Sequence, residues 1–255
     1  LLVIVGDLTA DDAQKLTEGA LGAWPSGKVP TLMKYPKAKV GDTSVIYLID
    51  RPEAQQATVQ IGNRAIDARN PDRYALELIN TVLGGSSSSR LYSNIREDKG
   101  YTYGIYSRFA RPNDVGTFRV IGDVNQDHVG DTIQEVLKEL KAIQSKPLTD
   151  QELTAAKGML LGNFALALEQ PSDFASQLAA RYLTKIPLTE FDQYADKMQA
   201  VTAAQAQAAA KKYIDTKQPI IVVVGNAEVV KPQLEAVGKV VVVDADGKVV
   251  EEAAK

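Results

Sequence analysis

The apolar positions of this chain follow two different periods, which come in blocks along the sequence. Stretches rich in apolar and β-branched residues predict strands, at 44–50, 57–61, 102–109, 116–123, 220–225 and 239–244. Apolar residues three and four apart predict helices, and the stripe of the helix expected at 70–83 consists of Tyr74, Leu78, Ile79 and Val82. Because strands and helices come in blocks, the pattern predicts an α+β fold, with helices packed on a mixed, mostly antiparallel sheet.

Polar residues at the expected helix starts carry capping signals. Asn70 is expected to cap the helix that follows it, with Pro71 in the first turn, and Asn125 to cap a helix that reaches about residue 144. A threonine with Glu, Asp or Gln three residues later has the pattern of a capping box. This pattern predicts three more helix starts, at Thr149, Thr189 and Thr202.

Two segments of the chain resemble each other. Residues 1–22 and 220–238 each read as an apolar strand, a Val-Gly-Asp or Val-Gly-Asn turn and a short amphipathic helix. This self-similarity indicates a duplicated architecture, in which residues 1–24 close a preceding homologous half and 44–255 form the next one. Residues 25–43, rich in proline and lysine, are expected to be a surface linker. The alternative is that any two strand–turn–helix units look alike.

The most distinctive stretch is SSSSRLYSNIREDKGYTYGIYS at 86–107. It predicts a short helix over 89–99, a left-handed residue at Gly100 that ends the helix, and a strand that follows directly. Arg96 would then leave the last helical turn, while Tyr103 projects from the strand. A guanidinium and a phenol on two rigid elements could hold a peptide carbonyl or a developing oxyanion. Alternatively, Arg96 caps carbonyls and Tyr103 is a half-buried sheet residue.

Composition excludes several classes of function. The net charge is −3, so nucleic acid and anionic membranes are poor partners, and no apolar run is long enough to span a bilayer. The chain has no cysteine and a single histidine, His128, which excludes thiolate sites and two-histidine metal sites supplied by this chain alone. His128 is expected to be a solvated surface residue. The glycines before the serine run follow a helix rather than a strand, which argues against a phosphate-binding loop.

Three stretches in the same order carry a resemblance to a known family. They are DRPEAQQATVQIG at 50–62, LGGSSSSRLYSNIREDKGYTYGIYS at 83–107 and IVVVGN at 221–226. With them the chain resembles the pitrilysin/insulinase class of zinc metallopeptidases, which includes the mitochondrial processing peptidase and the core subunits of the respiratory bc1 complex. The likeness covers essentially the whole chain.

The resemblance implies one half of a duplicated metallopeptidase, with a fold of the LuxS and processing-peptidase type. Family members have two homologous α+β halves, and the catalytic half carries an H-x-x-E-H zinc motif that this chain lacks. The chain therefore resembles the non-catalytic C-terminal half. That half lends an arginine and a tyrosine to its partner's active site, and Arg96 and Tyr103 stand at the matching positions. Ser89, Arg90 and Gly100 are the accompanying candidates for substrate binding.

On this reading the chain binds no cofactor itself, and zinc lies in a homologous catalytic half, on the same full-length chain or on a separate subunit. A peptide is the expected substrate. The alternative is a structural subunit of the core-protein type, without proteolysis, and a third reading is a stand-alone peptide-binding module. Retention of both Arg96 and Tyr103 favours the peptidase. The absence of cysteine suggests the bacterial periplasm or envelope, but localisation stays unknown.

Overall fold

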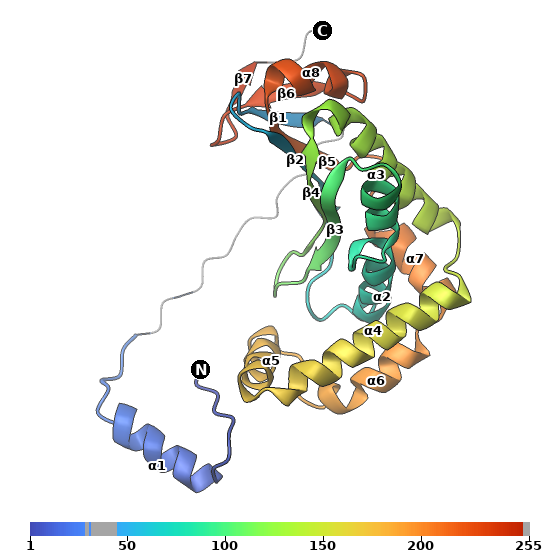
Figure 1. Ribbon diagram of the computed structural model, residues 1–255. Coiled ribbons are helices and arrows are strands. Elements are labelled where there is room, and N and C mark those ends of the chain that lie inside the picture. The colour runs from blue at the N-terminus through green and yellow to red at the C-terminus, as the bar shows by residue number, and fades with distance from the viewer. Residues whose placement is uncertain (29–30, 32–44, 252–255) are drawn as a thin grey trace.

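The computed structural model describes residues 1–28, residue 31 and residues 45–251. Most of the linker expected at 25–43 lies outside these described residues. The part from residue 45 onward forms a mixed sheet with helices packed against it (Figure 1). The predicted α+β architecture is confirmed.

The sheet has seven strands in the order β3-β4-β2-β5-β1-β6-β7. Only β1 pairs in parallel, with β5 and β6, and the other described pairings are antiparallel. The prediction of a mixed, mostly antiparallel sheet is therefore confirmed. The strands are β1 (Ile46–Asp50), β2 (Gln56–Arg64), β3 (Thr102–Ala110), β4 (Thr117–Asn125), β5 (Ile220–Gly225), β6 (Val240–Val243) and β7 (Val249–Glu251).

Helices α2, α3 and α7 lie together on one side of the sheet, and α4, α5 and α6 form the lower end of the part from residue 45 onward (Figure 1). A π-helix, η1 (Tyr92–Asp98), precedes β3, and a short 3-10 turn, η2 (Gln126–His128), follows β4. The α-helices are α1 (Ala10–Leu21), α2 (Arg73–Gly84), α3 (Val129–Ser145), α4 (Asp150–Glu169), α5 (Pro171–Thr184), α6 (Glu190–Ala200), α7 (Ala203–Tyr213) and α8 (Ala227–Glu235).

The core lies between the helix-covered face of the sheet and α2 and α3. Alternate residues of β3 and β4 point into it, as the period of two requires. The predicted apolar stripe of α2 is confirmed, because Tyr74, Leu78, Ile79 and Val82 are all buried.

The opposite face of the sheet is open. Strand register aligns Tyr106 of β3, Ile121 of β4, Gln60 of β2, Val222 of β5 and Tyr47 of β1 in one row across it. Tyr47, Tyr106 and Ile121 are exposed, at 38%, 45% and 36%. We call this row, together with the exposed Ile220, the open sheet face. An antiparallel sheet commonly packs only one face on the core. The neighbouring row of this open face carries Arg108 and Arg119, so apolar and charged side chains share it.

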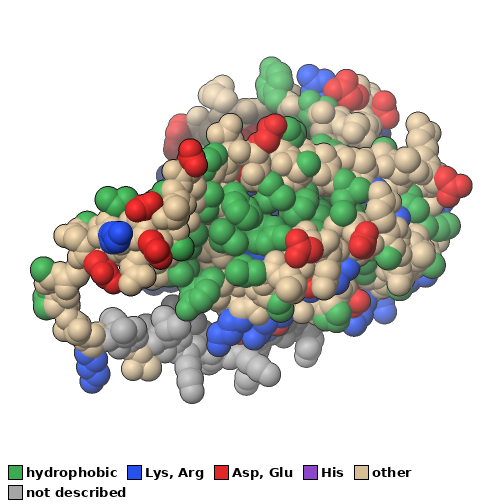
Figure 2. All heavy atoms as spheres, turned by 90° about the horizontal axis from the view of Figure 1, so that it is seen from below, with side chains coloured by type: hydrophobic (Ala, Val, Ile, Leu, Met, Phe, Trp, Pro, Cys, Tyr) green, Lys and Arg blue, Asp and Glu red, His purple; other side chains and the backbone are tan. Residues whose placement is uncertain are grey.

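The lower end of the molecule is also partly apolar. Figure 2 shows apolar side chains gathered in the middle of this face, with charged side chains around them. Exposed apolar residues on α4 and α5 include Leu166, Tyr182 and Leu183.

Residues 1–9 form no strand here, since a strand needs a hydrogen-bonded neighbour and none of the seven described strands pairs with this stretch. The assignment of this stretch to a preceding half stays a prediction. Two local predictions are wrong. Asn70 does not cap α2; its side chain accepts from the Asp72 backbone N–H at 2.9 Å, and Asp72 is the N-cap residue. Thr189 makes no capping box: its backbone is helical rather than extended, and its side chain makes no capping hydrogen bond. By contrast, the capping boxes at Thr149 and Thr202 are present.

Candidate functional site

The candidate site begins at the π-helix η1, which α3 holds in place. Ile95 of η1 is fully buried. The Asn94 side-chain amide donates to Glu135 at 3.0 Å and to Glu139 at 2.8 Å, both on α3. Lys99 lies 3.5 Å from Glu135, and hydrogen bonds from Asn94 and Lys138 lower the pKa of that carboxyl. π-helical turns are rare and often occur at functional sites, so η1 marks this corner as unusual.

Gly100 turns the chain from η1 into β3. Its φ of +69° is left-handed, as predicted. The Gly100 N–H donates to the Arg96 carbonyl at 3.2 Å, and the Tyr101 N–H donates to the Ile95 carbonyl at 3.1 Å. These two bonds fix the backbone of the corner, so the direction in which Arg96 leaves the helix is set relative to the start of β3.

Replacing Gly100 with alanine is expected to lower the free energy of unfolding by about 1–2 kcal/mol, the cost of a left-handed backbone for an L-residue. Nothing lies within 4 Å of the added methyl group, so backbone strain alone would cause the loss. Urea unfolding measures it. Gly158→Ala on α4 is the control: its methyl group also meets nothing within 4 Å, and it should stabilise the helix. Equal stability of Gly100→Ala and the unaltered chain would contradict a left-handed backbone at Gly100.

A β-bulge presents Tyr103 to solvent. Thr102 pairs with Val124 and Gly104 with Asp123, so Tyr103 is the extra residue between them. The Thr102 hydroxyl accepts from the Gly104 N–H at 3.0 Å and donates to the Asp123 carbonyl, so it links the two strands at the bulge. Tyr103 is 86% exposed. Bulges occur next to active sites, where they re-aim a side chain.

Aromatic contacts lead from Arg96 to this bulge. The guanidinium carbon of Arg96 lies 5.4 Å from the centre of the Tyr92 ring, and the rings of Tyr92 and Tyr106 are 5.8 Å apart. Tyr106 lies over Gly104, where a Cβ atom would be 2.9 Å from its ring. Arg96 also pairs with Glu97, and its side chain is 39% exposed. The structure therefore places both Arg96 and Tyr103 at the surface of one corner.

Ser89 and Arg90 have partners inside the domain. The Ser89 side chain is buried, and its hydroxyl donates to the Ser86 carbonyl at 2.6 Å. Arg90 makes two hydrogen bonds to Glu152 of α4, at 2.7 and 3.0 Å. Burial would raise the pKa of Glu152, but bonds from Arg90 and from Thr149 outweigh it and lower that pKa. These two residues hold the turn and the start of α4, and their role in substrate binding stays a prediction.

Comparison with known proteins identifies the family. The sequence profile described as "Peptidase M16 inactive domain" matches residues 1–160. The chain belongs to this family. The predicted membership in the zinc metallopeptidase class, as an inactive half, is thereby confirmed.

Relatives of this M16 inactive domain carry zinc-protease names. An uncharacterized zinc protease of Streptomyces coelicolor is 29% identical over 180 residues, which is 71% of this chain and 39% of that protein. The crystal structure of a peptidase M16 inactive domain from Pseudomonas fluorescens has a TM-score of 0.77 at 27% identity, covering 87% of this chain and 52% of the other. The chain thus spans about two fifths of the curated relative and about half of the solved one.

A chain of complex III2 from Candida albicans has the same fold. Its TM-score is 0.69 at 16% identity, and the match covers 91% of this chain and 57% of the other. At this identity the likeness concerns the fold alone.

The described residues of the M16 inactive domain do not fit a zinc ion. No three His, Cys, Asp or Glu side chains among them cluster in a way that could hold a metal. His128 is partly covered rather than fully solvated: its ring stacks on Tyr101 with centroids 4.2 Å apart, and Asp131 lies 3.7 Å away. Nor is any helix in the described part long and apolar enough to cross a membrane.

Sequence reasoning missed two aromatic residues of the corner. Tyr92 stands four residues before Arg96, a spacing that places two side chains on one helical face. Tyr106 stands two residues after Gly104, and the absence of a side chain at Gly104 makes room for its ring. Both signals are present in the sequence, but each also occurs in ordinary helices and strands, so neither indicates a site without the fold.

Proposed function

We propose that this domain is the non-catalytic half of a zinc-dependent endopeptidase, which lends Arg96 and Tyr103 to a partner half's active site. The observation that carries the proposal is the bulge at Tyr103: an 86% exposed phenol beside Thr102, whose hydroxyl bonds to the Gly104 N–H and the Asp123 carbonyl. A solvent-facing tyrosine gains nothing for folding from such a position. A bulge that re-aims it toward a ligand accounts for the arrangement.

The chemistry of the two side chains suits a substrate backbone. The Tyr103 hydroxyl can donate one hydrogen bond to the scissile carbonyl, and the bond strengthens as negative charge develops on that oxygen. The Arg96 guanidinium can donate to a neighbouring peptide carbonyl. Its pair with the exposed Glu97 is worth at most about 1 kcal/mol, so a substrate can replace it at little cost. Zinc in the partner half would polarise the carbonyl.

The open sheet face supports association with a homologous catalytic half. Tyr47, Tyr106 and Ile121 expose apolar surface that α2, α3 and α7 leave uncovered (Figure 1). Burying apolar surface drives most protein–protein association. Tyr106 belongs both to this face and to the aromatic contacts beside Tyr103, so a partner on the face would lie next to the corner.

We propose further that residues 1–24 close a preceding half and that 25–43 link it to the inactive domain at 44–255. The apolar stretch 1–5 lacks a strand partner among the described residues, as expected if its sheet belongs to that other half. The family profile, which begins at residue 1, is compatible with this division.

Zinc-dependent cleavage of a peptide by this chain, mixed with a candidate half that carries H-x-x-E-H, tests the proposal. In that mixture Arg96→Ala is expected to raise KM about 10- to 100-fold, the value of a hydrogen bond from a charged group, with kcat changed much less. Arg51→Ala, which removes another exposed arginine, is the control and should leave both constants unchanged. A fall in kcat with KM unaltered would rule out the assigned role of Arg96.

The second candidate is a structural subunit without proteolysis. The likeness of fold to a chain of complex III2 favours it. It predicts a stable complex with a homologous half but no cleavage in any mixture, so the same assay separates the two functions.

A further inference from the structure

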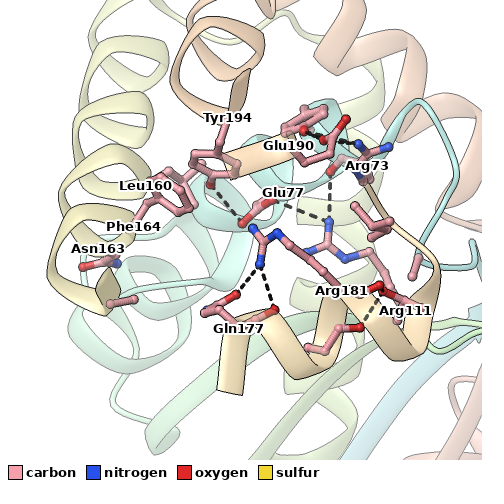
Figure 3. A pocket seen from close by; sticks show the side chains of 16 residues that line it. Arg73, Glu77, Arg111, Leu160, Asn163, Phe164, Gln177, Arg181, Glu190 and Tyr194 are labelled. Carbon is pink, nitrogen blue, oxygen red and sulfur yellow. Dashed lines mark hydrogen bonds and ion pairs between the residues drawn. The ribbon is translucent and has the colours of Figure 1, made fainter. Parts of the chain in front are cut away.

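A cavity of about 460 Å³ opens between α2, α4, α5 and α6 (Figure 3). This volume is within the usual range for a small-molecule site. Arg111 lines the cavity and follows the last residue of β3, whereas Tyr103 stands at the other end of that nine-residue strand. At about 3.3 Å per residue, the two ends are about 25 Å apart. The cavity is therefore separate from the corner that carries Arg96.

The charges in the cavity do not balance. Glu190 is bound by Arg73 and by Lys197. Glu77 lies 3.5 Å from Arg111 and accepts from Tyr194 at 3.3 Å. Both carboxylates that line the cavity are thus engaged, and their arginine partners account for two of the three arginines on its wall.

Arg181 is the third arginine, and no described carboxylate pairs with it. Its Nη1 donates to the Gln177 side-chain oxygen at 2.7 Å, while its Nε is buried with no hydrogen-bond partner in the described chain. Burial lowers the pKa of Arg181, although the nearby acidic groups counteract the shift. A buried N–H of a charged group without an acceptor is costly, so the guanidinium has capacity for an anionic ligand.

Arg181 lines the cavity. Its guanidinium carbon stacks 3.8 Å from the centre of the Phe191 ring, which covers one face of the group. Because the Nε is buried, a ligand in the cavity would have to bond to the Nη groups. Figure 3 shows the guanidinium groups of Arg111 and Arg181 beside each other in the middle of the cavity, with Gln177 and Glu77 at their ends. Paired guanidiniums suit a planar carboxylate, which accepts two parallel hydrogen bonds.

The remaining wall is partly apolar, with Asn163 and Thr184 as further polar residues. Phe164 and Tyr194 stack with ring centres 4.3 Å apart, and Leu160 and Ile186 also line the cavity. The surrounding lower face of the molecule carries further apolar side chains (Figure 2). A ligand that fits would therefore combine one negative group with an apolar body.

We infer that this cavity binds a carboxylate with an apolar side chain, of the size of one acylated amino acid, held by Arg181. Arg111, which pairs with Glu77 at 3.5 Å, lies beside it. The C-terminal residue of a peptide and a free branched carboxylic acid share this chemistry. The inference does not rest on the function proposed for Arg96 and Tyr103, because none of the residues that carry it belongs to that corner.

Isothermal titration calorimetry on the full chain at pH 7 tests the inference with N-acetyl-leucine, its neutral amide N-acetyl-leucinamide, and 4-methylpentanoate. The acid is expected to bind at least about tenfold more tightly than the amide, because the amide cannot accept charge-assisted bonds. Tighter binding of N-acetyl-leucine than of 4-methylpentanoate would assign the site to peptide termini, and the reverse order to free acids. Equal affinity for acid and amide, or no saturable binding of either acid, would overturn the inference.

Arg181→Gln should weaken N-acetyl-leucine about tenfold or more. The matched control is Arg51→Gln, an exposed arginine whose nearest carboxylate is 4.0 Å away, and it should bind as the unaltered chain does. Circular dichroism checks that the first variant folds. If the variant does not fold, NMR spectra of the unaltered chain with added N-acetyl-leucine replace this test. Changes in the amide chemical shifts of Ala167 and Ala180, which line the cavity, would support the inference. Changes confined to other residues would refute it.

Discussion

Replacing Tyr103 with phenylalanine is expected to lower kcat of the assembled peptidase about 100- to 1000-fold, with KM nearly unchanged. The exchange removes one oxygen from a side chain that is 86% exposed and has no hydrogen-bond partner in the described chain, so the fold should not change. Loss of one donor to a developing oxyanion typically costs about this much in rate. Steady-state kinetics with a peptide substrate and the catalytic half in excess measure the effect.

Tyr182→Phe provides the matched control for this experiment. Tyr182 lies on α5 and is 67% exposed, so it is also a largely exposed tyrosine, but it is far from the bulge in the chain. Its removal should leave both constants unaltered. A kcat for Tyr103→Phe within about threefold of the unaltered chain would show that the phenol does not stabilise the transition state.

The sequence predicted those features that neighbouring residues determine. Gly100 takes the left-handed conformation because it directly follows a helical turn, and Thr149 forms its capping box with a residue three positions later. The same local rules also failed twice. Asn70 and Thr189 have the right residue types for caps, but α2 begins two residues later, after Asp72, and the Thr189 backbone is already helical. Propensity is a weak prior that tertiary context overrides.

Features that join distant parts of the chain could not be predicted in this way. The bulge at Tyr103 depends on the register of β3 against β4, which no short stretch encodes. Arg90 is paired with Glu152, 62 residues away, so a residue that looked available for substrate is engaged in the structure. Arg96 and Tyr103 were found from their family motif, whereas the contacts of Tyr92 and Tyr106 that connect them required coordinates.

The same limit applies to Glu190, the first residue of α6. It is 8% exposed and bonds to Tyr74, 116 residues away on α2, as well as to Arg73 and Lys197. Burial alone would raise the pKa of Glu190, but hydrogen bonds from Lys197, Tyr74 and Arg73 outweigh it and lower the pKa to about 2. The carboxylate therefore ties α6 to α2 in its charged form.

Glu190→Gln is expected to lower the free energy of unfolding by about 3 kcal/mol at pH 7, because it leaves the partly buried Arg73 without its counter-charge. The difference should depend on pH. The pKa of Glu190 is below its ordinary value of 4.5 in the folded state, so its contribution is complete above about pH 4.5 and is lost as the pH falls toward 2. Urea unfolding of both chains between pH 7 and pH 2.5 measures this.

Glu53→Gln is the control, since the Glu53 side chain is 75% exposed and its arginine neighbour is 4.0 Å away. Such a surface pair contributes at most about 1 kcal/mol. Stability curves for Glu190→Gln and the unaltered chain that converge in acid would show that the charge of Glu190, rather than its shape, holds α6 on α2. If the difference in the free energy of unfolding between the two chains stays the same down to pH 2.5, the glutamine destabilises the fold through its packing. The ion pair with Arg73 would then contribute nothing to the fold.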